Sequence, residues 1–454
     1  MKALDKNSTK PLYEQLYEYL RDDILSGRIR AGKKLPSKRT LADQLQISLI
    51  TVENAYSQLI AEGYVRSVQR SGYFVQYSGG VVKLPERGRC NLPEQFTEDT
   101  QNDTIEQIPQ PSAGAELFPF SVWSRLMRSV ILEQGTRLLQ PVKNGGAQEL
   151  RKAISEYLYR ARGIYTPPER IIVGSGTEYL YNLLIQLLGR DKRYGVENPG
   201  FPKLPKIYAL NDVRFEYISL DNSGMRTDEL YEKRVDIAHI SPAHHFPTGI
   251  VMPISRRREI LDWAESGSDR FIIEDDYDSE FRRSGKPVPT IFGTDGLQRV
   301  IYINTFSQTI APSVRISYMC LSESLYEQWR GKLGFYACSV PAFEQYTLAR
   351  FISGGYFERH INRTRKRFRR ICELVTELIS RYPKVEISEV NAGLHFTVKA
   401  PENSAKVIED CGRCGIKITR LAEYYAERSQ CPDDLFLVNY SNADEKRITE
   451  LLKS

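Results

Sequence analysis

The chain has 454 residues, of which 41% are hydrophobic and 26% are charged, and its formal net charge is +6. This composition is typical of globular proteins, and the length is more than one hydrophobic core usually supports, so we expect two or three domains. No apolar run approaches the roughly 18–20 residues that cross a bilayer, and residues 1–6 lack the apolar core of a signal peptide. These features argue against a membrane or secreted protein and predict a cytoplasmic one with no membrane partner.

The seven cysteines indicate neither a disulfide framework nor a metal site. They are odd in number and scattered, and only Cys411 and Cys414 have the spacing of metal ligands, with no second pair and no histidine cluster beside them. We therefore expect reduced thiols and no metal site.

The first sixth of the chain predicts three helices and a β-hairpin. Apolar residues recur every four positions over 12–24, as on the buried face of an amphipathic helix. A short second helix is predicted over 37–45, with a serine at its N-cap position. A third is predicted over about 49–62, and residues 64–75 alternate as a hairpin does.

The segments Leu35-Pro36-Ser37, Glu62-Gly63 and Gly72-Tyr73-Phe74-Val75 give residues 1–77 a resemblance to the winged helix-turn-helix of the GntR family. The resemblance implies double-stranded operator DNA as partner, with the third helix in the major groove and the second helix and wing on phosphates. Residues 1–75 contain twelve Lys/Arg and eight Asp/Glu, and this positive net charge favours binding to DNA. The candidate DNA contacts are Ser37, Lys38, Arg39, Ser48, Thr51, Tyr56, Arg66 and Arg70.

The start of the third helix departs from the GntR pattern. Leu49 stands where the family usually has an arginine, and Ile50 follows it. Neither side chain can donate a hydrogen bond to a base edge, so the two residues either contact thymine methyl groups or serve packing.

Residues 78–111 predict a linker. They begin with Ser-Gly-Gly, contain several prolines, and become polar and acidic without hydrophobic periodicity. In the resembled family, a joint of this length allows the head to dock on the body of the partner subunit.

Residues 112–454 predict an α/β domain. Strand-like runs at 170–173, 194–197, 236–240, 271–274 and 300–303 alternate with helical stretches, which indicates a mostly parallel sheet covered on both faces. Ligands bind such sheets at the carboxyl ends of the strands.

Two motifs follow such strands. The turn Gly174-Ser175-Gly176-Thr177 opens a helix and would favour a phosphate, although a simple tight turn has the same pattern. Asp275-Asp276-Tyr277 ends another strand. Acidic residues at such a strand end either bind a ligand or, more often, are simply exposed to solvent.

Residues 302–318 resemble the cofactor-lysine region of fold-type I aminotransferases, which use pyridoxal 5′-phosphate (PLP). The resemblance implies that Asp275 pairs with the pyridine nitrogen, that Tyr277 reaches the 3-hydroxyl group, and that Phe201 stacks on the ring. It also implies a phosphate cup that includes Arg315. The full set of candidate cofactor residues is Ser175, Gly176, Thr177, Phe201, Asp275, Tyr277, Ser307, Gln308 and Arg315.

Three positions depart from catalytic aminotransferases. Gln308 stands in place of the Schiff-base lysine, and a carboxamide neither condenses with an aldehyde nor acts as a base. Pro141 aligns with a tyrosine that reaches the neighbouring subunit's cofactor phosphate, and residues 435–440 lack the arginine that binds the substrate carboxylate. We therefore expect no catalytic residue and no transaminase activity.

A GntR-type head before an aminotransferase-like body resembles the MocR group of bacterial transcription regulators. This implies a fold-type I large domain, a smaller C-terminal α+β subdomain and a homodimer. We expect the body to sense PLP or a related, amino-acid-like effector, with PLP bound weakly and non-covalently, or lost. Two alternatives stay open, namely a body that is only a dimerisation scaffold and an enzyme with residual PLP chemistry.

Arginines and one lysine crowd residues 363–370. The run is either the solvated face of a helix or a second surface that contacts or steers DNA.

Overall fold

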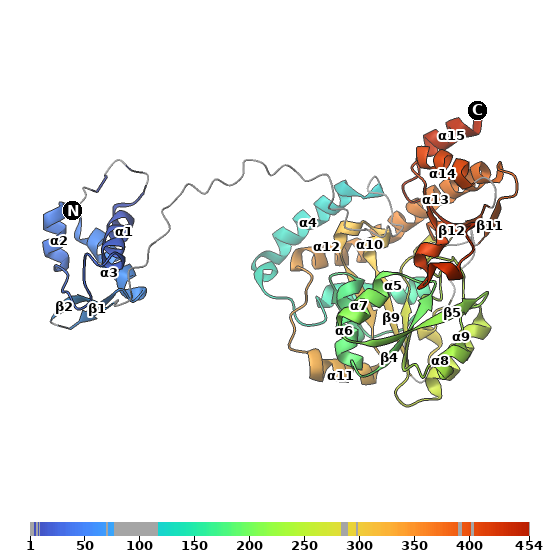
Figure 1. Ribbon diagram of the computed structural model, residues 1–454, viewed down its shortest axis with the longest axis horizontal. Coiled ribbons are helices and arrows are strands. Elements are labelled where there is room, and N and C mark those ends of the chain that lie inside the picture. The colour runs from blue at the N-terminus through green and yellow to red at the C-terminus, as the bar shows by residue number, and fades with distance from the viewer. Residues whose placement is uncertain are drawn as a thin grey trace. The chain divides into compact units, whose positions relative to one another are not determined.

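A computed structural model describes residues 4–5, 8, 10–69, 71–76, 117–282, 289–296, 298–388, 393–400 and 404–453. The chain forms two compact units, Met1–Glu106 and Gln107–Ser454, here called the head and the body (Figure 1). The predicted linker, 78–111, lies outside the described residues. No helix in the described part of the chain is long and apolar enough to cross a membrane.

The head has the three helices and the hairpin that its sequence predicts. Serine side chains cap two of the helices, because Ser37 Oγ accepts a hydrogen bond from the Thr40 N–H at 3.1 Å and Ser48 Oγ accepts one from the Thr51 N–H at 3.2 Å. The elements are α1 (Leu12–Leu25), α2 (Lys38–Leu45), α3 (Leu49–Ala61), β1 (Val65–Val68) and β2 (Gly72–Val75).

The head has a core of its own. Leu16 and Leu20 of α1 pack with Val52 and Leu59 of α3, and all four side chains are almost fully buried. The wing strands β1 and β2 pair antiparallel, and Val75 at the end of the wing is buried in the same cluster. This core therefore fixes the position of α3 and of the wing.

The body is built on an eight-stranded sheet of order β3-β10-β9-β8-β7-β4-β5-β6. β10 runs antiparallel to β3 and β9, and β6 runs antiparallel to β5, while the remaining pairs are parallel. The carboxyl ends of the parallel strands, and of β3, therefore share one edge. The strands are β3 (Ile171–Gly174), β4 (Arg193–Asn198), β5 (Arg214–Asp221), β6 (Gly224–Met225), β7 (Ile237–Ile240), β8 (Phe271–Asp275), β9 (Val300–Thr305) and β10 (Ser317–Cys320).

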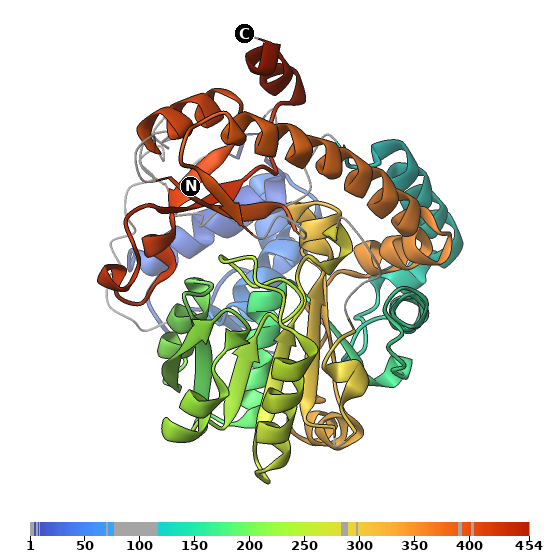
Figure 2. The same ribbon diagram turned by 90° about the vertical axis from the view of Figure 1, so that its right-hand side faces the viewer.

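Helices cover both faces of this sheet (Figures 1 and 2). Ile301 and Ile303 of β9 pack toward the side of α6, α7 and α11, whereas Val300 and Tyr302 pack toward the opposite side. The helices are α4 (Phe120–Gln134), α5 (Gln148–Arg162), α6 (Thr177–Leu188), α7 (Lys203–Leu210), α8 (Thr227–Glu232), α9 (Ile254–Glu265), α10 (Phe306–Thr309), α11 (Glu323–Leu333) and α12 (Ala342–Ser353).

A smaller C-terminal subdomain follows, as predicted. Its four strands pair antiparallel in the order β11-β12-β14-β13. The long α13 leads into it and crosses the top of the body in Figure 2. The elements are α13 (Tyr356–Ser380), β11 (Glu386–Ser388), β12 (His395–Lys399), α14 (Ser404–Arg413), β13 (Lys417–Arg420), β14 (Leu435–Asn439) and α15 (Glu445–Lys453).

Short 3-10 helices complete the body. The described ones are η2 (Gly135–Leu139), η3 (Pro168–Arg170), η4 (Ser279–Phe281), η5 (Phe292–Thr294), η6 (Pro312–Val314), η7 (Leu421–Tyr424) and η8 (Arg428–Gln430).

A buried ion pair joins the end of α5 to the residue after β8. Arg162 Nη2 lies 2.5 Å from Asp276 Oδ2, and their side chains are only 4% and 1% exposed. The Tyr302 hydroxyl donates to the same oxygen at 2.8 Å. Removing the Arg162 guanidinium would leave the buried Asp276 carboxylate with the Tyr302 hydroxyl as the one remaining donor of these two.

We expect Arg162→Met to lower the free energy of unfolding of the body by about 3–5 kcal/mol, since breaking a buried pair strands a buried charge. Tryptophan fluorescence during urea unfolding measures this, because the three tryptophans all lie in the body. Arg160→Met is the matched control. It breaks the exposed pair with Glu358 and should cost less than about 1 kcal/mol. Equal effects of the two changes would contradict the assignment.

Candidate ligand pocket and DNA-binding surface

A pocket lies at the carboxyl ends of the parallel strands. About 620 Å³ of space not filled by atoms lies in and before it, open solvent included, and the centre of a water molecule can enter about 30 Å³ of that space. Five predicted cofactor residues line it, together with residues from four strand ends and from α6 and α7. The lining residues are Thr177, Tyr181, Val196, Glu197, Phe201, Leu204, Ser241, Phe246, Asp275, Tyr277, Thr305 and Gln308. None of these is a lysine or an arginine.

Asp275 is held from behind by two side chains that the sequence did not indicate. The Tyr181 hydroxyl donates to Oδ2 of Asp275, and His239 Nε2 lies 3.7 Å from the same oxygen. His239 is itself fixed by the Tyr208 hydroxyl, 2.7 Å from Nδ1. The other carboxylate oxygen, Oδ1, is buried without a hydrogen-bond partner in the described part of the chain. This oxygen can accept a hydrogen bond from a ligand.

Glu197 adds a second buried carboxyl group to the pocket wall. Burial, with a further contribution from the charge of Asp275, raises its pKa well above the ordinary value. Its Oε2 accepts the Ser241 N–H at 3.1 Å and lies 3.4 Å from Nε2 of His245. Burial and the neighbouring His244 lower the pKa of His245 to about 3, so this imidazole is uncharged at neutral pH.

The predicted phosphate cup lies at the start of α6. Gly176 has φ +96°, and a Cβ there would collide with the guanidinium of Arg315, so only glycine allows this approach. Arg315 Nη2 is 3.2 Å from Glu178 Oε2, and Lys203 Nζ is 2.8 Å from the other oxygen of that carboxylate. Glu178 therefore already forms an ion pair with Arg315, the cation that the cup would offer to a phosphate.

Of the three remaining cup residues, Thr177 lines the pocket, and Ser175 and Ser307 differ in their surroundings. Ser307 is 9% exposed, and its hydroxyl has no hydrogen-bond partner within the described ranges. The backbone N–H of Ser175 donates to Ser339 Oγ at 3.1 Å. Neither residue lines the pocket, nor do Gly176 and Arg315.

Gln308 lies in the short helix α10, directly after β9, and lines the pocket. Its side chain is buried, with 5% exposure. The residue lies in the segment that resembles the cofactor-lysine region, and it presents a carboxamide to the pocket. The geometry supports binding at this site and supplies no amine.

Apolar side chains surround β14, the strand on which the resembled aminotransferases carry the arginine that binds the substrate carboxylate. Leu437 of β14 packs with Phe246, Leu421 and Tyr424 in a buried cluster that also contacts Phe201 and Tyr277 of the pocket. Arg420 is 63% exposed and lies 3.8 Å from Asp433, and Arg428 is in the exposed part of η8. Neither arginine lines the pocket.

The acids that follow β8 are buried, so the alternative of solvated acids at a strand end is wrong. Five of the seven residues from Glu274 to Glu280 are acidic, and all five are almost fully buried. Each of the five meets at least one donor from another segment of the body. Glu274 accepts the N–H groups of Ile291 and Phe292 at 3.0 and 2.8 Å. Burial raises its pKa to about 7.

In the head, most predicted DNA contacts are exposed or half-buried side chains on α2, α3 and the wing. Tyr56 is an exception and the prediction for it is wrong. It is fully buried, and its hydroxyl donates to the Pro36 carbonyl at 2.9 Å, which makes it a core residue. Lys38 Nζ is 2.5 Å from Glu53 Oε1. Arg70 lies outside the described residues.

Leu49 and Ile50 are 43% and 68% exposed at the start of α3. The packing alternative therefore does not apply within the head. The structure leaves apolar surface where the recognition helix begins.

The basic run on α13 is divided between several roles. Arg363 donates to the Leu117 carbonyl at 2.7 Å, and Arg365 donates to the Glu280 carbonyl at 2.8 and 3.0 Å. Arg370 pairs with Glu445 of α15 at 3.1 Å. The first two contacts join segments of the body, a role that neither predicted alternative included.

A winged helix-turn-helix and an aminotransferase-type body define this chain as a DNA-binding protein with an enzyme-like second domain. Residues 12–75 match the family model "Bacterial regulatory proteins, gntR family", and residues 110–453 match "Aminotransferase class I and II". The chain belongs to the MocR group of GntR-type transcription regulators. Relatives that are 37% and 30% identical match 99% and 88% of this chain.

The chain is 37% identical to the HTH-type transcriptional regulator YdeL of Bacillus subtilis, over 99% of this chain and 97% of YdeL. It is 30% identical to the probable rhizopine catabolism regulatory protein MocR of Rhizobium meliloti, over 88% of this chain and 84% of MocR. It is 27% identical to the pyridoxine biosynthesis regulator PdxR of Corynebacterium glutamicum, over 93% and 91% of the two chains.

Among solved structures, an archaeal alanine:glyoxylate aminotransferase superposes with a TM-score of 0.66 at 22% identity. The match covers 76% of this chain and 88% of the enzyme. At this identity the likeness concerns the fold, and it confirms the predicted fold-type I body.

We expect Arg39→Ala to weaken binding to all DNA sequences alike and to reduce the slope of log affinity against log salt by about 1, as the loss of one phosphate contact does. Fluorescence anisotropy with operator and unrelated duplexes at several salt concentrations measures both quantities. The control is Arg21→Ala in α1, whose guanidinium pairs with Asp22 at 2.9 Å and should leave affinity unchanged. Loss at a single base position would make Arg39 a base-reading residue, and no loss would remove it from the interface.

Proposed function

We propose that the body of this transcription regulator is a sensor that binds PLP, or a related ligand with a pyridine ring and a phosphate, without a covalent bond. Ligand binding would alter operator binding by the heads of a homodimer. The observation that carries the proposal is the buried Asp275 oxygen left for a ligand inside a pocket whose lysine position is Gln308.

The chemistry of the pocket fits a PLP-like ligand. Asp275 would pair with the pyridine nitrogen, Tyr277 would face the 3-hydroxyl group, and Phe201 would stack on the ring. Gly176 and Arg315 would form the cup for the phosphate together with the Ser307 hydroxyl, which has no hydrogen-bond partner among the described residues. Charge-assisted hydrogen bonds contribute roughly 1.5–3 kcal/mol each, so a few of them support binding at about micromolar concentration. The name of the relative PdxR, a pyridoxine biosynthesis regulator, points to the same class of ligand.

The same pocket argues against catalysis. PLP bound in an aminotransferase supplies an electron sink for amino-acid substrates, but the chain must supply an amine to bond it and move a proton. Gln308 supplies neither function. The pocket lining also lacks a cation for a substrate carboxylate, because the apolar cluster around Leu437 and Phe246 stands at that wall.

Exposed apolar side chains on one segment of the body support dimerisation. Leu132 of α4 and Leu139 of η2 are each 77% exposed, and Phe120 at the start of α4 is 71% exposed. Exposed large apolar side chains gathered on one surface are typical of protein interfaces. A dimer would present two heads, and hence two half-sites on the operator.

We expect PLP to bind reversibly, to leave on dialysis, and to leave no adduct after borohydride reduction. Gln308→Lys should gain a borohydride-stable adduct, because the other pocket groups are in place, and should convert amino acids slowly or not at all. Gln308→Met, which has similar length and no amine, is the matched control and should behave as the wild type. Equilibrium dialysis and intact mass after reduction measure these outcomes.

Three results would redirect the proposal. A reduced adduct on the wild-type chain would revive the enzyme alternative. No PLP binding by the wild type would favour the dimerisation scaffold. Rapid turnover by Gln308→Lys would show that the carboxylate site lies elsewhere in the body.

We expect Glu178→Gln to tighten PLP binding about two- to fivefold, because the wild-type carboxylate competes with the phosphate for Arg315 at a half-exposed site. Lys203 holds the pKa of Glu178 below its ordinary value, so the group is charged at neutral pH. Pyridoxal, which lacks the phosphate, is the control ligand and should show no gain. An equal gain for both ligands would mean that Glu178 acts on the pocket as a whole.

A further inference from the structure

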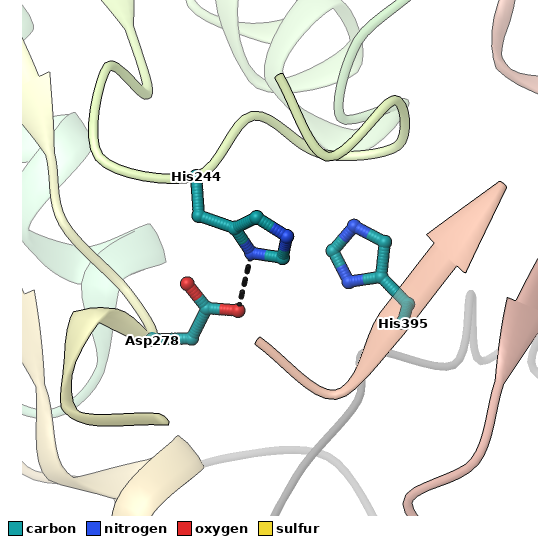
Figure 3. Close-up of side chains that lie close together, drawn as sticks. All are labelled: His244, Asp278 and His395. Atoms are coloured by element: carbon teal, nitrogen blue, oxygen red, sulfur yellow. Dashed lines mark hydrogen bonds and ion pairs between the residues drawn. The ribbon is translucent and has the colours of Figure 1, made fainter. Parts of the chain in front are cut away.

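A second cluster of polar side chains lies beside the ligand pocket, behind Tyr277. His244 comes from the segment after β7, Asp278 from the turn after β8, and His395 from the first position of β12 (Figure 3). One ligand atom from each residue lies within 4.8 Å of the other two. His244 Nδ1 is 2.8 Å from Asp278 Oδ2, and the two imidazole centroids are 4.4 Å apart.

Three ring nitrogens of this cluster lack a hydrogen bond. Nε2 of His244 and both nitrogens of His395 are buried, and none makes a hydrogen bond of good geometry in the part of the chain that the structure describes, although the backbone of His245 lies close enough to His395 to interact with it. The whole side chains are 1%, 2% and 0% exposed for His244, Asp278 and His395. Burying a polar atom without a hydrogen bond destabilises a protein by about 1–3 kcal/mol. Three such nitrogens close together therefore indicate that a ligand or ion binds among them.

The surroundings favour a cation as that partner. Both imidazoles and the carboxyl group of the cluster are buried, and the carboxyl groups of Asp275 and Asp276, on the same stretch of chain as Asp278, are buried as well. Two imidazoles beside a carboxyl group are the donor set of zinc and neighbouring divalent ions.

We propose that His244, Asp278 and His395 form a binding site for one divalent transition-metal ion of the zinc class. Two histidines and one carboxylate satisfy three positions of a tetrahedral site and leave the fourth for water or another ligand. The three residues come from two loops of the large sheet and from a strand of the C-terminal sheet. A bound ion would therefore clamp the C-terminal subdomain to the large domain.

The site also adjoins the ligand pocket. The Tyr277 hydroxyl lies 3.4 Å from Nδ1 of His244, and Tyr277 lines the pocket. Metal binding would thus fix the wall that carries Tyr277. The proposal does not depend on PLP binding, since its residues and its test are separate from those of the pocket.

The sequence offered no sign of this site. Its three ligands are separated by 34 residues or more, and the expectation of no metal site rested on cysteine spacing. Cys411 and Cys414, the pair with metal-like spacing, are buried in the apolar core of the C-terminal subdomain. Burial raises the pKa of Cys411 to about 12, which keeps it a thiol and disfavours metal binding there.

The test uses the full chain without a histidine tag, stripped by a chelator and then titrated with Zn²⁺ or Co²⁺. We expect one equivalent of metal per chain, a higher thermal midpoint with Zn²⁺, and the intense visible absorption of tetrahedral Co²⁺. His395→Phe should weaken binding by more than about 100-fold, because loss of a direct ligand exceeds the 10–100-fold effect of losing an outer partner. Isothermal titration and elemental analysis give affinity and stoichiometry.

Two controls isolate the site. The double change Cys411→Ser and Cys414→Ser, and separately His360→Phe, should retain the full equivalent, because neither removes a ligand of the cluster. His395→Phe without metal should be at least as stable as the stripped wild type, since neither nitrogen that it removes makes a hydrogen bond of good geometry within the described ranges. Absence of a stoichiometric site in the wild type, or equal binding by wild type and a folded His395→Phe, would overturn the proposal.

Discussion

The burial of five acids within one seven-residue stretch constrains the body more than any other feature. From Glu274 to Glu280 the chain leaves a central strand and carries charge into the interior, which is costly unless every carboxyl group meets donors. The donors come from elements far apart in sequence, so satisfying the acids requires the correct packing of those elements. They are the backbone after residue 290, Tyr181, Arg162 and Tyr302, His244, and Tyr157 with Asn304.

This constraint ties one wall of the ligand pocket to the packing of the body. The environment of Asp275 is part of the fold, because Tyr181 and His239 hold it from the layer behind the pocket. Gln308 lies in the four-residue helix α10 directly after β9 and lines the same pocket as Asp275.

Much of the fold follows from local sequence signals. Helices and wing in the head were predicted within a few residues, since apolar spacing, serine caps and glycine turns all act locally. The parallel core of the body was predicted from its β-branched runs, and the strand ends located Asp275 and Gln308. The antiparallel β10 and the edge pairing of β5 with β6 had no such signal, because pairing partners are set by the tertiary fold.

The parts that escaped prediction depend on contacts between distant segments. Tyr56 has the helical spacing of a core residue and also matches a family contact position, and only its burial decides between the two. Tyr181 and His239 lie in apolar stretches where a polar side chain gives no hint of its partner. The arginines of α13 look alike in sequence, yet Arg365 is tied to a backbone carbonyl of the body and Arg370 to an exposed glutamate.

The exposed pair at the start of the recognition helix has a consequence for how this regulator chooses its sites. Leu49 and Ile50 contribute nothing to the core of the head, which is built from the opposite face of α3. Aliphatic side chains at a base edge can read only its shape and the thymine methyl group. If α3 enters the major groove, substitutions at these two exposed positions would change the choice of operator with little effect on folding stability. Target choice and structural integrity would then depend on separate faces of one helix.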